Sequence, residues 1–91
     1  MMAQAADLHL RLSERLQPFQ LEVLDESADH AGHVGANDAG RGTHFRVRIG
    51  SALFQGLPRV KRHRLVYDAL QDFIDQGLHA LAIEIVDPPS V

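Results

Sequence analysis

The 91-residue sequence contains no cysteine. Without this residue the chain can form no disulfide, supply no thiol nucleophile and offer no thiolate to a metal ion. Its six histidines are therefore the only soft ligands it has.

Long apolar runs and recognisable catalytic motifs are also absent. No window approaches the 18 or so apolar residues of a membrane span, and the first 16 residues lack a basic segment ahead of a long apolar one. We therefore expect a cytoplasmic protein without a membrane partner. The serines lack the setting of a nucleophile elbow, and there is no phosphate-binding glycine loop and no HExxH pair, so we do not expect an enzyme.

Size and composition indicate one compact domain. Hydrophobic residues make up 45% of the chain and charged residues 23%, which are ordinary globular values. A chain of this length has room for one hydrophobic core, so we expect a single domain over residues 1–91 with its core over about 7–87. The formal net charge of −3 provides no general attraction for nucleic acid.

The first half of the chain shows one helix pattern and two strand patterns. Leu8, Leu12 and Leu16 recur every four residues and predict a helix over 7–16, which Pro18 ends. Period-two alternation predicts a short strand over 19–25 and a second over 43–51, whose outer face is basic. Between them, residues 25–42 contain four glycines and no sustained apolar period, which indicates a long loop.

The second half predicts a helical turn, a helix and a last strand. Gly56 and Pro58 indicate a break, after which apolar residues at three- and four-residue steps predict a helix to about Gln76 with Gly77 at its C-cap. Residues 78–87 alternate as a strand. A strand, helix and strand crossover is right-handed and parallel, while the first two strands can pair antiparallel. The sequence thus predicts an α+β fold, a small three-stranded mixed sheet with its helices on one face.

Three histidines are expected at one end of this sheet. The parallel crossover places His79, at the head of the last strand, at the edge where the long loop carrying His30 and His33 enters the second strand. Two imidazoles form an incomplete metal site, because a closed tetrahedral site needs four ligands. Two thiolates from a partner would complete the mixed ligation known for some [2Fe–2S] centres.

A second cluster is basic. It opens the predicted second helix and comprises Arg59, Lys61, Arg62, His63 and Arg64. These cations predict a phosphate-contacting patch, with duplex DNA as the alternative partner. Arg46 and Arg48 are nearby in the sequence, on an exposed face of the predicted second strand. Cations at a helix N-terminus oppose the macrodipole, which indicates a pairing or binding role, with carboxylates of the acidic loop as candidate partners.

Segments spread over most of the chain resemble the BolA family. They are LEVLDES, THFRV, FQGLPRVKRHRLVY and LHALAI, in that order between about Leu8 and Ile85. DHAGHVGA, residues 29–36, is similar to the histidine-containing loop of bacterial members. The chain departs from the family pattern before THF, where Arg41 and Gly42 stand in place of the usual Ser or Gly followed by Glu.

The resemblance implies a class II KH-like fold and a non-enzymatic partner of monothiol glutaredoxins that carry the CGFS motif. In such complexes a [2Fe–2S] cluster is bridged by the glutaredoxin's cysteine, its bound glutathione and histidine of the BolA-like protein. By position this implies His79 and a loop histidine, for which His30 is favoured over His33 because of its spacing from Glu26. His44 and His63 also match family positions and are interpreted as structural. We expect a chain that is monomeric alone or a weak homodimer.

Overall fold

The computed structural model describes residues 4–27, 44–78 and 80–88. Its elements are α1 (Ala5–Leu16), β1 (Gln20–Asp25), β2 (His44–Gly50), the 3-10 turn η2 (Ala52–Phe54), α2 (Arg59–Ala69), α3 (Gln71–Asp75) and β3 (Ala80–Ile85). The predicted order of elements is confirmed, with one difference in the second half.

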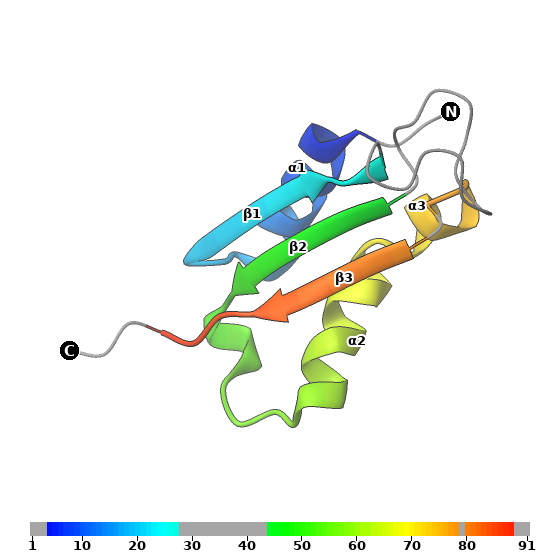
Figure 1. Cartoon of the computed structure of the whole chain (residues 1–91). Coiled ribbons are helices and arrows are strands. Elements are labelled where there is room, and N and C mark those ends of the chain that lie inside the picture. The colour runs from blue at the N-terminus through cyan, green and yellow to red at the C-terminus, as the bar shows by residue number, and fades with distance from the viewer. Residues whose placement is uncertain (1–3, 28–43, 79, 89–91) are drawn as a thin grey trace.

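The three strands form one mixed sheet in the order β1-β2-β3. β1 pairs antiparallel with β2, with Gln20 opposite Gly50, and β2 pairs parallel with β3, with His44 opposite Ala80. The helices lie on one face of this sheet (Figure 1). The predicted α+β fold with a small mixed sheet is therefore confirmed.

The core lies between β2 and the helices. Phe45, Val47 and Ile49 alternate along β2 and are at most 2% exposed. They pack with the apolar stripes of the helices, which consist of Leu8, Leu12, Leu16, Val66, Ala69 and Leu70. The apolar residues that alternate along the strand therefore pack against the apolar faces of the helices in one cluster.

α1 begins two residues earlier than its apolar pattern predicts. The backbone N–H of Gln4 donates to the Asp7 carboxylate over 3.2 Å, which satisfies an amide group that would otherwise lack a partner at the helix start. The helix ends at Leu16, and Gln17 adopts a left-handed conformation (φ 46°) directly before Pro18.

The second helix is interrupted at Leu70, so the prediction of one helix to Gln76 is wrong. Arg11 of α1 donates to the carbonyl of Ala69 over 3.0 Å, and this carbonyl would accept from Phe73 in a continuous helix. The Phe73 N–H donates instead to the Leu70 carbonyl, also over 3.0 Å. The apolar period continues across the interruption, which is why the sequence predicts a single helix. Gly77 follows α3 with φ 121°, as expected of a C-terminal glycine.

Within the described residues, no helix is both long and apolar enough to cross a membrane.

Leu12 and Leu10 provide a matched test of the core. Leu12 is fully buried, whereas Leu10 on the same helix is 61% exposed. We expect Leu12→Ala to lower the free energy of unfolding by about 2 to 5 kcal/mol, because it removes buried methyl groups and leaves a cavity. Leu10→Ala should change it by less than about 0.5 kcal/mol. Urea denaturation measures both, and equal costs would contradict this assignment of the α1 faces.

Candidate functional site

The end of β1 and the starts of β2 and β3 meet at one edge of the sheet (Figure 1). Asp25 is opposite Phe45 in the first pair of strands, and His44 is opposite Ala80 in the second. This edge is where the sequence predicts the histidine ligands.

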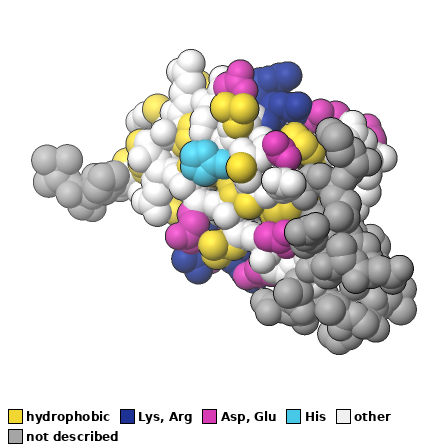
Figure 2. Space-filling model, turned by 90° about the horizontal axis from the view of Figure 1, so that it is seen from above, with side chains coloured by type: hydrophobic (Ala, Val, Ile, Leu, Met, Phe, Trp, Pro, Cys, Tyr) yellow, Lys and Arg dark blue, Asp and Glu magenta, His cyan; other side chains and the backbone are white. Residues whose placement is uncertain are grey.

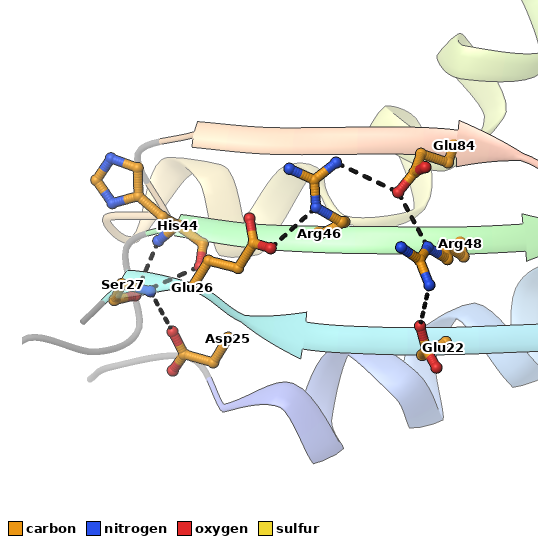
Figure 3. A network of polar contacts seen from close by, with 8 residues as sticks. All are labelled: Glu22, Asp25, Glu26, Ser27, His44, Arg46, Arg48 and Glu84. Atoms are coloured by element: carbon orange, nitrogen blue, oxygen red, sulfur yellow. Dashed lines mark hydrogen bonds and ion pairs between the residues drawn. The ribbon is translucent and has the colours of Figure 1, made fainter. Parts of the chain in front are cut away.

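Ser27 joins the chain beyond β1 to the start of β2. Its hydroxyl accepts a hydrogen bond from the His44 N–H over 3.0 Å, and the Glu26 N–H donates to the His44 carbonyl over 2.8 Å. The Asp25 carboxylate accepts from the Ser27 N–H over 2.9 Å. Ser27 is fully buried and His44 is 9% exposed, so the hydrogen bond between these two residues is shielded from water. We call Asp25, Glu26, Ser27 and His44 the clasp (Figure 3).

Next to the clasp, charges of both signs cover the face of the sheet that the helices leave open (Figure 3). Arg46 donates to Glu26 over 2.9 Å and to Glu84 over 3.2 Å. Arg48 donates to Glu84 and to Glu22, each over 3.1 Å. Two arginines and three glutamates thus form a continuous network across all three strands.

The network shifts the pKa values of its members. Hydrogen bonds from Arg48 and then Arg46 lower the pKa of Glu84 below its usual 4.5. The carboxylates of Glu26 and Glu84 raise the pKa of Arg46, and Glu84 does the same for Arg48. All three groups are charged at neutral pH, so the two arginines of this face are already neutralised by carboxylates of the same chain.

A shallow hollow of about 250 Å³ lies between the clasp and the start of β3. Its rim carries Glu26, His44 and Arg46, and small side chains of β3, Ala80 and Ala82, also line it. The imidazole of His44 lies at the edge of the sheet where β3 begins (Figure 3).

The predicted ligands His30, His33 and His79 lie outside the described residues. His79 immediately precedes Ala80, and Ala80 is the register partner of His44. His30 follows Ser27 of the clasp by three residues. The described chain therefore brings the attachment points of the predicted ligands to one edge of the sheet.

The structure separates Arg46 and Arg48 from the predicted basic patch on α2. Arg46 and Arg48 lie on the open face (Figure 3), whereas α2 covers the opposite face (Figure 1) and carries Arg59, Lys61, Arg62, His63 and Arg64. Of these cations, Arg62 is near a carboxylate of the described residues, 3.9 Å from Asp87. The acidic loop, predicted to supply their partners, is mostly outside the described residues. On the face seen in Figure 2, acidic, basic and apolar side chains are interspersed.

Sequence reasoning missed Glu26, Ser27 and Glu84. The arginines at period two on β2 and the single charge of β3, Glu84, are visible in the sequence, but the ion pairs follow only from the strand register, in which Arg48 is opposite Glu84. His44 was predicted on the polar side of its strand, and its position in the clasp explains why it is nonetheless buried.

The described residues do not form a metal site by themselves. Among residues 4–27, 44–78 and 80–88, no group of three or more His, Asp or Glu side chains is arranged to hold a metal ion. Since the chain has no cysteine, its soft donors are imidazole nitrogens, which replace two thiolates on one iron in some [2Fe–2S] centres. A cluster bound here through histidine would take its thiolates from another molecule.

Comparison with known proteins supports the family. The BolA-like protein family model matches residues 12–89. SufE-like protein 1 of Arabidopsis thaliana is 51% identical over 85 residues, covering 89% of this chain and 23% of that protein. A Sinorhizobium protein described as an uncharacterized protein in the cobS 5′ region is 46% identical, covering 86% of this chain and 84% of its own length.

A solved structure has the same fold. The BolA domain of SufE1 from Arabidopsis thaliana superposes with a TM-score of 0.82 at 44% identity, covering 97% of this chain and 95% of that one. The fold and the polar edge define a small α+β domain built on a three-stranded mixed sheet. The chain belongs to the BolA-like protein family.

The clasp makes a testable contribution to stability. Ser27→Ala removes the buried acceptor of the His44 N–H, and we expect it to lower the free energy of unfolding by about 1 to 3 kcal/mol. Ser13→Ala, on the solvent side of α1, is the control and should cost less than about 0.5 kcal/mol. Urea denaturation compares them, and a neutral Ser27→Ala would show that the clasp is unimportant for stability.

The network predicts a pH dependence of stability. Because the pKa of Glu84 is lowered in the folded state, its contribution is present above the unfolded value and is lost as pH falls through the lower folded value. Glu84→Gln should therefore reduce the loss of unfolding free energy between pH 7 and pH 3. Glu14→Gln on α1 is the control and should leave that loss close to wild type. A Glu84→Gln variant with the wild-type acid limb would contradict the prediction.

Proposed function

We propose that this protein is a non-enzymatic partner of a monothiol glutaredoxin with a CGFS motif. The two proteins share a bridging [2Fe–2S] cluster in iron–sulfur trafficking or iron regulation. The glutaredoxin and its bound glutathione supply the thiolates, and this chain supplies histidine nitrogen. Membership of the BolA-like family and the absence of cysteine support this proposal.

The convergence at one sheet edge is the observation that carries the proposal. The clasp joins Ser27 to His44, and His44 is opposite Ala80, the residue after His79. The segment bearing His30 and His33 therefore leaves and rejoins the sheet beside the attachment point of His79.

Chain geometry favours His30 over His33 as the loop ligand. Three residues of fully extended chain span at most about 11 Å, so the Cα of His30 stays within that distance of the Cα of Ser27. His33 is six residues from Ser27, and its permitted range is twice as long. Fixing His30 in one position therefore costs less conformational entropy of the chain than fixing His33.

The cluster, when bound, is the carrier of iron and sulfide. The chain's own residues hold a neutral imidazole toward it, and the clasp fixes the base of the segment from which that imidazole comes. Arg46 and Arg48 are neutralised within the sheet and present little net positive charge to an incoming protein. The cations of α2 remain a predicted partner surface. Duplex DNA remains the alternative partner for that surface.

The test is reconstitution of the cluster with histidine variants. Mixing the chain with a CGFS glutaredoxin, glutathione, iron and sulfide should give a visible spectrum that His79→Ala alters, with cluster affinity lowered about 10-fold or more. His9→Ala, an exposed histidine on α1, is the control. His30→Ala should reproduce the His79→Ala effect more closely than His33→Ala does.

The binding of the metal-free glutaredoxin, measured by calorimetry, separates ligation from docking. Unchanged metal-free binding together with a changed spectrum supports histidine ligation. A wild-type spectrum for His79→Ala would exclude His79 as a ligand.

A further inference from the structure

A larger hollow lies at the other end of the sheet. It occupies about 500 Å³ where β1 begins and where β2 and β3 end. Apolar walls come from Phe19, Phe54, Val86 and Pro88, while Ser51 and Arg62 supply polar groups. In Figure 1 this end is opposite the edge that holds the clasp. It lies away from the clasp, and of its lining only Arg62 also belongs to the predicted partner surface on α2.

Backbone hydrogen bonds fix the walls of this hollow. The Phe19 N–H donates to the Gly50 carbonyl and the Val86 N–H to the Ile49 carbonyl, each over 2.9 Å. The Phe19 ring lies so close to Gly50 that a Cβ there would be 2.4 Å from it. Gly50 thus allows the Phe19 ring to approach the strand end closely, and the hollow is present without a ligand.

The guanidinium of Arg62 lines this hollow, and the residues that the structure describes satisfy it only in part. Its Nε donates to the Leu57 carbonyl over 2.8 Å, which anchors the side chain. Its Nη1 is 3.9 Å from the carboxylate of Asp87, beyond hydrogen-bond distance, and that carboxylate is 88% exposed. A guanidinium has five donors, so Arg62 retains donors for an anionic ligand.

A second hollow adjoins the first and increases the positive charge. It occupies about 240 Å³ and is lined by Leu57, Arg59, Arg62, Ile85 and Asp87. Arg62 and Asp87 line both hollows. Two arginines and one exposed carboxylate therefore line this second hollow, and the charge of its described lining favours an anion.

We propose that the larger hollow binds a small carboxylic acid with an apolar body. The carboxylate pairs with Arg62 in place of Asp87, and an aromatic or branched aliphatic body lies against Phe19, Phe54 and Val86. The volume is within the range of small-molecule sites, which are mostly apolar with a few placed polar groups. Bidentate pairing with a carboxylate is the geometry that a guanidinium provides best.

Titration of the isolated chain with two matched probes tests the proposal. In ¹H–¹⁵N NMR spectra, 4-phenylbutyrate should shift the amides of Phe19, Phe54 and Val86 in a saturable way. The alcohol 4-phenylbutanol has the same apolar body without the charge. Its affinity should be lower by about 10-fold or more. Shifts confined to other surfaces, or equal affinity for both probes, would overturn the proposal.

Asp87→Asn is the most direct test of the pairing with Arg62. The residue is exposed, so this substitution should leave the fold intact. It eliminates the competing carboxylate, so phenylbutyrate should bind about two- to five-fold more tightly. Asp68→Asn, an exposed aspartate on α2, is the control and should leave the affinity unchanged. Equal affinities in the wild type and Asp87→Asn would count against the pairing with Arg62.

Arg62→Met should weaken binding of phenylbutyrate about 10-fold or more and leave phenylbutanol unaffected. Its spectrum in the absence of ligand reports whether the fold is retained. Both probes are used without a cluster or glutaredoxin, so the result is independent of the proposed function.

Discussion

The double pairing of β2 is the constraint on which the rest of the structure depends. This strand is hydrogen-bonded on both edges, antiparallel to β1 and parallel to β3. Its apolar residues Phe45, Val47 and Ile49 turn toward the helices, so a shift of one residue would expose all three. The same register brings Arg48 opposite Glu84 and His44 opposite Ala80. Core, ion pairs and candidate site are thus fixed by a single alignment.

The open face shows how that alignment limits function. Two arginines on one strand, considered alone, indicate a surface that binds anions. Here they alternate with three glutamates in a network whose charges nearly balance. A partner that contacts this face meets both signs of charge at close spacing. Recognition there would depend on matching a pattern, since little net field is available for long-range attraction.

The sequence predicted most of the fold because its apolar periods are regular and its turns contain glycine and proline. It could not predict the interruption at Leu70. That interruption depends on a hydrogen bond from Arg11 to the carbonyl of Ala69, and these residues are 58 positions apart in the sequence. It also could not separate Arg46 and Arg48 from the α2 cations, because nearness in sequence does not show which face of the sheet a residue occupies. The candidate edge was found from topology alone, but the clasp required the pairing of Ser27 with His44.

The clasp also bears on how this family can vary in length. Since Ser27 and His44 are held together by their own hydrogen bonds, the sheet does not depend on the number of residues between them. Loop closure becomes only about 0.6 kcal/mol less favourable for each doubling of loop length. Insertions and deletions between Ser27 and His44 therefore change the free energy of folding little. Selection can alter the length of this interval to suit different partners while the sheet stays constant.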